Sequence, residues 1–254
     1  MKLSEATSQF YDKHWADFPL DIKKVADHLI HLFPEGVEGK RVLDAGCGSG
    51  IVSLAFSKLG ADVLGVDASA ECINNSRERA KQFGLGALFE RHDLTQLDLG
   101  EKRFDIIYSW GVLHHTADAR ESFDRLVRHL SPKGKIVIAV YLKTWLSGFW
   151  NFSRIFYQKS PWRIKKLIQT LLSIFLRIFD MIHIAIYGKE NYYERGTQNA
   201  ELINDWFGVP QRTFHSYNEV FNWFKENDLE YKLTNPATGR FKSTSNFEVV
   251  GTAH

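Results

Sequence analysis

Residues 42–50 read VLDAGCGSG, a short hydrophobic run that ends in a glycine-rich loop and leads into a helical pattern. Gly46 and Gly48 lack a Cβ, so the backbone can turn sharply there and a ligand can lie against its amides. In open α/β sheets, nucleotides bind at the loop after the first strand. This stretch therefore predicts a nucleoside-binding loop at the carboxyl end of a strand.

Two aspartates end the next two predicted strands. Asp67 lies about 20 residues after Gly46, where a carboxylate can bind ribose hydroxyls. Asp93 ends the third strand, where it can accept a hydrogen bond from an adenine amino group. Either aspartate alone could equally cap a helix or a strand-end turn. Three such signals in this order favour a nucleoside site.

The loop indicates which kind of nucleotide binds. The dinucleotide pattern G-x-G-x-x-G would need glycine at the position of Ile51, and the loop lacks the lysine of a phosphate-binding P-loop. Asp44 would repel a pyrophosphate but would tolerate an ammonium group. The loop therefore favours a nucleoside with a positively charged amino-acid tail.

Hydrophobic runs alternate with helical patterns up to about residue 142. This succession predicts a parallel sheet with right-handed crossovers and helices on both faces. We expect Thr116 to cap the third helix and SPKG (131–134) to form the turn after it. The expected strands are 41–46, 61–67, 87–93, 104–110 and 135–141, and the expected helices are 50–59, 69–83 and 117–130.

The alternation resumes at His215, where Ser216 and Glu219 form a capping-box pattern before an apolar helix face. Strands are expected at 229–234 and 247–253. We expect one domain with a core of residues 36–142 and 215–254. An N-terminal lid of about 1–35 and a helical cap insertion of about 143–214 would complete it.

The motifs together resemble those of the class I S-adenosylmethionine-dependent methyltransferases. VLDAGCGSG is similar to the first motif of that family, GVDAS (65–69) to its ribose loop and HDL (92–94) to its adenine loop. FDIIYSWGVLHH (104–115) and LSPKGKIVIAVY (130–141) are similar to its fourth motif and the strand after it. The resemblance implies an α/β fold with a Rossmann-like, mostly parallel seven-stranded sheet, whose last strand lies antiparallel between the fifth and sixth. It also implies S-adenosylmethionine as cofactor and S-adenosylhomocysteine as product.

The resemblance implies a role for particular residues. Asp44 and the glycine loop would meet the amino-acid tail of the cofactor, Asp67 and Ala68 its ribose, and the 92–94 loop its adenine. Residues 110 and 111 would line the sulfonium side, and Tyr11 would form an N-terminal lid. The expected cofactor-binding residues are Tyr11, Asp44, Gly46, Cys47, Gly48, Asp67, Ala68, Asp93, Leu94, Trp110 and Gly111.

Methyl transfer to a hydroxyl, thiol or amine also requires removal of a proton. His114 and His115 follow the fourth strand and are candidates for the general base. They could instead form the pocket wall or cap the next helix, and positioning alone could supply the acceleration. His215 is a lesser candidate that fits the entry of a helix.

The acceptor is expected to be a small molecule. The chain has SWGV (109–112) where nucleic-acid amino methyltransferases carry an Asn/Asp-Pro-Pro-Tyr/Phe motif, and its net charge is only +2, so we expect no nucleic-acid partner. An apolar or aromatic acceptor methylated at O, N or C is favoured. The candidate acceptor contacts are Trp15, Tyr141, Tyr192, Tyr193, Arg195 and Trp206.

Residues 143–187 carry seven basic side chains before their first acid, Asp180, and many aromatic ones. Polar residues form a narrow stripe on an otherwise apolar helix, so most of its girth should be buried. It could serve as a lid and dimer surface, dock on an anionic membrane or admit a lipid-like acceptor, or bind an acidic small molecule. A monomer and a homodimer both remain open.

Composition excludes other classes. With 254 residues, 44% hydrophobic and 24% charged, the chain is neither disordered nor a nucleic-acid-binding tail. Two cysteines cannot build a disulfide framework or a four-ligand zinc site, and no signal-peptide pattern is present, so we expect a cytoplasmic protein without a metal. The alternatives are a nicotinamide-dependent oxidoreductase and a non-catalytic, membrane-associated module of the same fold.

Overall fold

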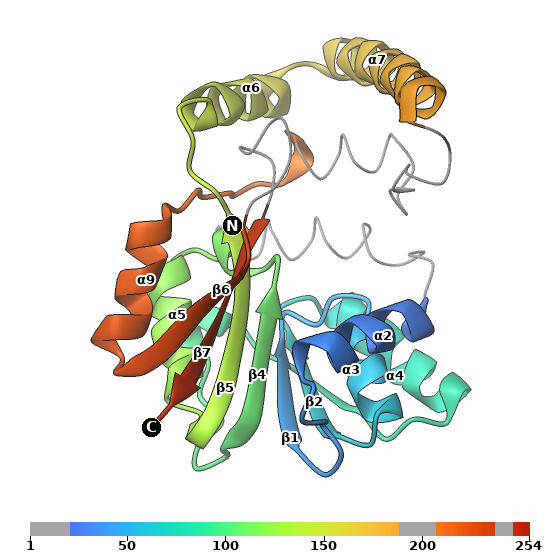
Figure 1. Cartoon of the computed structure of the whole chain (residues 1–254). Coiled ribbons are helices and arrows are strands. Elements are labelled where there is room, and N and C mark those ends of the chain that lie inside the picture. Colours follow the sequence, from blue (N-terminus) through green and yellow to red (C-terminus); the bar gives the residue numbers. More distant parts are fainter. Residues whose placement is uncertain (1–20, 188–206, 237–245) are drawn as a thin grey trace. The chain divides into compact units, whose positions relative to one another are not determined.

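The computed structural model describes residues 21–187, 207–236 and 246–254, and contains a seven-stranded sheet of order β3-β2-β1-β4-β5-β7-β6 (Figure 1). Strands β1 to β5 are mutually parallel, and β7 runs antiparallel to both of its neighbours. The predicted seven-stranded sheet with an antiparallel last strand is therefore confirmed. The strands are β1 (Arg41–Ala45), β2 (Asp62–Asp67), β3 (Leu88–Arg91), β4 (Phe104–Trp110), β5 (Leu130–Tyr141), β6 (Leu229–Asn235) and β7 (Asn246–Ala253).

Helices cover both faces of the sheet, as Figure 1 shows. One face packs on α2 (Ile22–Leu32), α3 (Ile51–Lys58) and α4 (Ala70–Phe83), and the other on α5 (Ala119–Val127) and α9 (Tyr217–Glu226). Each face has its own buried hydrophobic cluster, so the central strands are apolar on both sides. The short 3-10 helices η1 (Leu94–Gln96) and η2 (Leu113–His115) follow β3 and β4.

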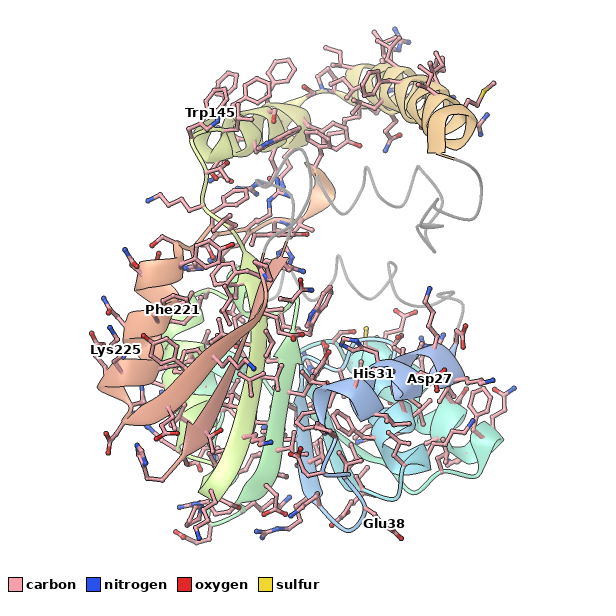
Figure 2. The ribbon with its side chains drawn as sticks, in the orientation of Figure 1. Asp27, His31, Glu38, Trp145, Phe221 and Lys225 are labelled. Carbon is pink, nitrogen blue, oxygen red and sulfur yellow. The ribbon has the colours of Figure 1, made fainter. Side chains whose placement is uncertain are left out.

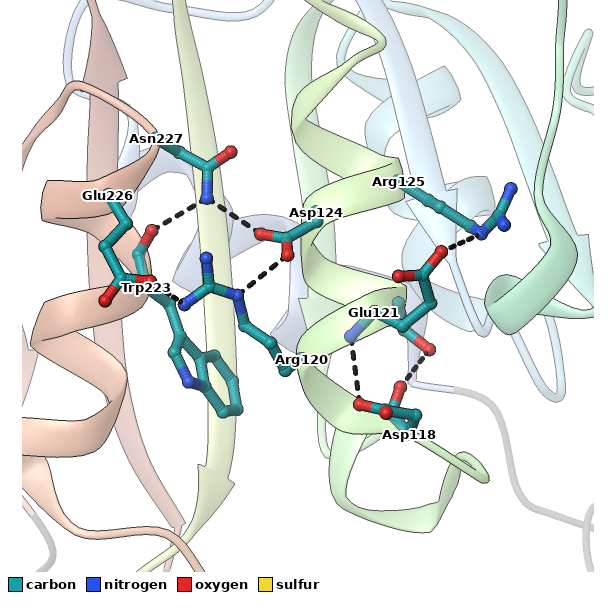
Figure 3. Close-up of polar contacts among 9 residues, drawn as sticks. Asp118, Arg120, Glu121, Asp124, Arg125, Trp223, Glu226 and Asn227 are labelled. Carbon is teal, nitrogen blue, oxygen red and sulfur yellow. Dashed lines mark hydrogen bonds and ion pairs between the residues drawn. The ribbon is translucent and has the colours of Figure 1, made fainter.

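Helices α5 and α9 come from distant parts of the sequence and lie side by side (Figure 3). The Arg120 guanidinium donates to Asp124 at 2.8 Å and to Glu226 of α9 at 2.6 Å. Asn227 donates to the same aspartate at 2.8 Å. Helix α9 begins with the predicted capping box of Ser216 and Glu219. The chain therefore returns to the sheet after the insertion.

The predicted cap of α5 and the turn after it are wrong. Asp118 caps the helix by accepting from the Glu121 amide, because the Thr116 hydroxyl already donates to the Leu113 carbonyl and closes η2. Residues 131–134 lie within β5, as a bulge that shifts the register opposite β4. Lys133 takes a φ of 61°, so the turn-forming residues bend the strand without ending it.

The described part of the expected N-terminal lid belongs to the core. Ile22, Ala26 and Leu29 of α2 are buried with the neighbouring α3, and Asp21 caps the helix through the Lys24 amide. The opposite side of α2 faces solvent and carries Asp27 and His31 (Figure 2). Any lid role therefore falls on residues 1–20, which lie outside the described residues.

The chain divides into two compact units, Met1–Ser147 with Gln211–His254, and Gly148–Pro210. Residues 211–214 of the expected cap belong to the first unit, because the Lys143 amide donates to the His215 carbonyl and the His215 amide donates to the Tyr141 carbonyl (both 2.9 Å).

The second unit contains most of α6 (Ser147–Lys159) and all of α7 (Trp162–Tyr187). Tyr157 of α6 packs on Phe207 and accepts a hydrogen bond from Gln169 of α7 at 2.7 Å. None of the described side chains of α7 is fully buried by the rest of the chain, so the burial of most of its girth stays a prediction. In the ranges that the structure describes, no helix is both long and apolar enough to span a bilayer.

Candidate cofactor and acceptor site

The loops after β1, β2 and β3 are joined by hydrogen bonds. The amides of Gly46 and Cys47 donate to the Val66 carbonyl at 2.7 and 3.0 Å. The Asp67 carboxylate accepts from the Gly48 amide at 3.0 Å and from the Ser69 amide at 2.8 Å. The His92 amide donates to the Asp67 carbonyl at 3.0 Å. The three strand-end turns singled out in the sequence are therefore neighbours in space.

Gly46 must be glycine for two reasons. Its φ of 85° is in the left-handed region, and a Cβ built there would lie 2.3 Å from Val112 Cγ1. Val112 follows β4, so this contact also holds the loop after β4 against the glycine loop. Four strand ends thus contribute to one site.

Asp44 is a buried carboxylate beneath the glycine loop. Burial raises the pKa of Asp44 to about 7, although the Ser53 hydroxyl donates to it at 2.6 Å, and nearby Asp67 raises this pKa further. A carboxylate that is costly to ionise in the free protein is stabilised when a cation binds beside it. This environment fits the ammonium group of an amino-acid tail and disfavours a pyrophosphate.

Helix α4 supports the glycine loop from outside. The hydroxyl of Ser76 donates to the Gly48 carbonyl at 3.2 Å, and the Arg79 guanidinium donates to the Ser49 carbonyl at 2.8 Å. Cys47 is buried within the loop, and burial raises the pKa of its thiol well above the ordinary value. Its thiol is therefore protonated at neutral pH and is no nucleophile.

In the turn after β3, fewer side chains are available to a ligand than the sequence predicts. One oxygen of Asp93 accepts from the Thr95 amide (2.9 Å) and hydroxyl (2.7 Å), so the aspartate caps η1. Leu94 is buried in the core, which leaves only its backbone at the loop surface. The Ala68 carbonyl accepts from Arg91 at 2.9 Å and ties this turn to the ribose loop.

The end of β4 carries an exposed ring, and a glycine with positive φ follows it. Trp110 is 45% exposed. Gly111 has a φ of 76°, and its amide donates to the Ala139 carbonyl at 3.0 Å. Both therefore stand at the sheet edge where the glycine loop lies.

His114 lies in an aromatic cluster two residues beyond Val112. Its ring centroid is 4.1 Å from those of both His115 and Tyr141. Burial lowers the pKa of His114 well below 6.5, and the neighbouring His115, His215 and Arg212 lower it further. The ring is buried, and neither of its nitrogens has a hydrogen-bond partner within the described ranges. His114 is thus neutral at pH 7 and can bind a polar group of a ligand.

Residues 211–214, which sequence reasoning missed, complete the cluster together with His215. The Thr213 amide donates to the His114 carbonyl at 2.8 Å. The Arg212 guanidinium lies 5.6 Å from the Tyr141 ring centroid and 5.3 Å from that of Phe214. The only sequence signal near this segment is the entry of the helix that follows it. The pairing of Leu142 with His215 is a tertiary contact, which a local sequence pattern does not indicate.

The other two histidines of this region have partners. His115 Nδ1 lies 3.0 Å from the Gln211 carbonyl oxygen. The ring nitrogens of His215 lie 2.7 Å from Glu219 and 2.8 Å from the Thr213 hydroxyl, which fits the expected role at the entry of α9. Of the predicted acceptor contacts, Tyr141 lies in the cluster. Five acceptor candidates and one cofactor candidate lie outside the described residues: Trp15, Tyr192, Tyr193, Arg195, Trp206 and Tyr11.

A sheet of this strand order, with a glycine loop after β1 and an acidic residue at the end of β2, defines the Rossmann-like fold of class I methyltransferases. Residues 15–231 match the family model described as a methyltransferase domain, so the chain belongs to this family.

Curated relatives match the core of the chain. The ubiquinone biosynthesis O-methyltransferase of Rhodopseudomonas palustris (strain TIE-1) is 33% identical over 135 residues, which are 51% of this chain and 53% of the relative. The enzyme of that name from Coxiella burnetii (strain Dugway 5J108-111) is 36% identical over 100 residues, covering 39% of this chain and 43% of the relative. The chain spans about half the length of the curated relatives it matches.

Solved structures share the fold. Magnesium protoporphyrin IX methyltransferase from Synechocystis PCC 6803, crystallised with bound S-adenosylmethionine, aligns at a TM-score of 0.61 and 14% identity over 100% of this chain and 98% of its own. The YcgJ protein from Bacillus subtilis aligns at a TM-score of 0.56 and 16% identity, over 91% of this chain and 99% of its own. At this identity the likeness concerns the fold.

Proposed function

We propose that this chain binds S-adenosylmethionine and transfers its methyl group to a hydroxyl of a small, apolar or aromatic acceptor, releasing S-adenosylhomocysteine. Family membership supports the reaction class. The observation that carries the proposal is that two carboxylates, buried Asp44 and Asp67, lie beside the hydrogen-bonded turns after β1 and β2. An oxygen acceptor is favoured over nitrogen or carbon because the curated relatives are named O-methyltransferases.

The residues present fit the cofactor. The oxygens of Asp67 accept hydrogen bonds from the Gly48 and Ser69 amides, and a carboxylate is also a suitable acceptor for ribose hydroxyls. The loop from Gly46 to Gly48 would lie against the amino-acid tail, with Asp44 balancing its ammonium charge. Trp110 and Gly111 would line the sulfonium side, and Asp93, with the backbone of Leu94, would flank adenine. When bound, the cofactor supplies an electrophilic methyl group.

His114 would accept the proton of the acceptor hydroxyl. Its ring is neutral because burial disfavours the imidazolium, so a nitrogen lone pair is available at pH 7. Its position two residues after Val112, which contacts Gly46, puts it near the cofactor loop. Tyr141 packs against the ring at a tilt and Arg212 lies over Tyr141, and these two residues would form the acceptor wall. The burial of the His114 ring would exclude water from the reacting groups.

The test is turnover with radiolabelled S-adenosylmethionine and a panel of phenols, catechols and matched amines. We expect label in a phenolic product and stoichiometric S-adenosylhomocysteine. His114→Asn should lower kcat far more than it changes the affinity for S-adenosylhomocysteine. Cofactor binding without turnover on any acceptor would favour the non-catalytic module, and tight binding of NAD would favour the oxidoreductase.

A further inference from the structure

Helix α7 exposes a continuous apolar stripe. Its side chains on this stripe are about 40 to 70% exposed, for example Leu171 at 58%, Phe175 at 63% and Met181 at 71%. At about 100° per residue the stripe covers roughly 120° of the helix circumference. Its members are Ile164, Leu167, Leu171, Ile174, Phe175, Ile178, Met181 and Ile182.

The stripe adjoins the side of α7 that faces α6 but uses different residues. Ile168 and Leu172 pack against the cluster of Tyr157 and Phe207, so they stabilise the two-helix unit. Around the helix, Leu171 lies about 60° from Ile168 and Phe175 about 20° from it, and both side chains remain exposed. Exposed residues of the stripe can therefore be substituted without removing the contacts that hold α6 and α7 together.

Basic side chains border one edge of the stripe. Arg163, Lys166 and Arg177 are exposed and fall within about 100° of one another on the helix, next to the apolar arc. Lys159 at the end of α6 is exposed as well. Residues 143–187 contain one acidic residue, Asp180. A helix face that is apolar with a cationic border is complementary to a partner with an apolar interior and anionic groups at its surface.

We propose that the α7 stripe and its basic edge dock on an anionic lipid bilayer, with the helix lying in the plane of the headgroups. The apolar side chains would enter the acyl boundary, while Arg163, Lys166 and Arg177 would contact lipid phosphates. A second copy of the chain fits less well, because a two-fold interface would bring the same basic edges together with few acids to neutralise them. The proposal does not depend on methyl transfer.

The test is flotation of the full chain with vesicles of phosphatidylcholine alone or mixed with phosphatidylglycerol. We expect binding to the mixed vesicles that weakens as salt is added. The triple variant R163E/K166E/R177E should bind at least about 100-fold more weakly, since each cation near an anionic surface contributes about fivefold. Leu171→Ser with Phe175→Ser should also lose binding, with no change in charge.

A matched control separates a local face from overall charge. K23E/K81E/K225E changes the net charge by the same amount, through exposed lysines on α2, α4 and α9; Lys225 points into solvent in Figure 2. This control should keep nearly full vesicle binding, and all variants should keep the wild-type circular dichroism spectrum. The proposal is overturned if wild type binds no better to vesicles that contain phosphatidylglycerol, or if both triple variants lose vesicle binding equally. A concentration-dependent dimer without vesicle binding, abolished by the serine pair, would also overturn it.

Discussion

Replacing Asp44 with asparagine should stabilise the free protein at alkaline pH and weaken its cofactor binding. Burial raises the pKa of Asp44 from 3.8 to about 7. Between these values the folded chain keeps a proton that the unfolded chain releases, so stability falls as pH rises through this window and levels off above it. At about 1.4 kcal/mol per pKa unit, ionised Asp44 costs the fold at most about 4 kcal/mol above pH 7.

Asparagine mimics the protonated carboxyl and can still accept the hydrogen bond from Ser53. Asp44→Asn should therefore match wild type near pH 4 and be more stable at pH 8, by up to about 4 kcal/mol. Urea unfolding at a series of pH values, without cofactor, measures this difference. The same variant should bind S-adenosylmethionine at least about tenfold more weakly, because it loses a charged partner for the ammonium group.

Asp105 provides a control of opposite sign. Burial raises its pKa, but hydrogen bonds from the Arg41 amide and guanidinium outweigh this and leave the pKa lowered. Asp105→Asn should therefore lose stability above pH 4 and leave cofactor affinity unchanged. If Asp44→Asn is no more stable than wild type at pH 8, or binds cofactor normally, the role assigned to this carboxylate is wrong.

Other perturbations test the rest of the site. Gly46→Ala should destabilise the fold by about 2–5 kcal/mol in urea unfolding, because the backbone there is left-handed and the new Cβ would overlap Val112. Adding Val112→Ala should recover part of this loss. Equal losses of stability in the single and double variants would contradict the contact. The activity of wild type should not fall as pH is lowered through 6.5, because the pKa of His114 lies well below that value. A pH–rate profile with a midpoint at 6.5 that survives in His114→Asn would assign the proton transfer to another group.

The sheet could be predicted because its signals are local. The alternation of strands and helices, the glycine loop and the capping box of α9 each depend on nearby residues, and the order with β7 between β5 and β6 came from the family resemblance. The prediction of a turn at 131–134 was wrong because the pairing of β5 with β4 keeps these turn-forming residues inside a bulged strand. Tertiary contacts overrode local propensity there.

The acceptor side was less predictable because it is built from distant segments. His114 was found as a residue that follows a strand, and Tyr141 as the last residue of one. Arg212 and Phe214 were missed, since tertiary hydrogen bonds from residues 211–215 to η2 and to the end of β5 bring them to the site. The exposure of α7 could not be predicted either, because an apolar helix pattern indicates that the helix contacts another surface but not whether that surface belongs to the same chain.

Titration calorimetry with S-adenosylhomocysteine tests the central claim most directly, using wild type, Asp67→Asn and Asp67→Ala. We expect one site per chain in wild type and an affinity reduced about tenfold or more in Asp67→Ala, because a hydrogen bond to a charged group contributes ~1.5–3 kcal/mol. Asp67→Asn, which keeps an acceptor for the Gly48 amide, should fall between them. Unchanged affinity in both variants, or binding of NAD in place of S-adenosylhomocysteine, would show that the joined turns do not hold an adenosyl group with a cationic tail.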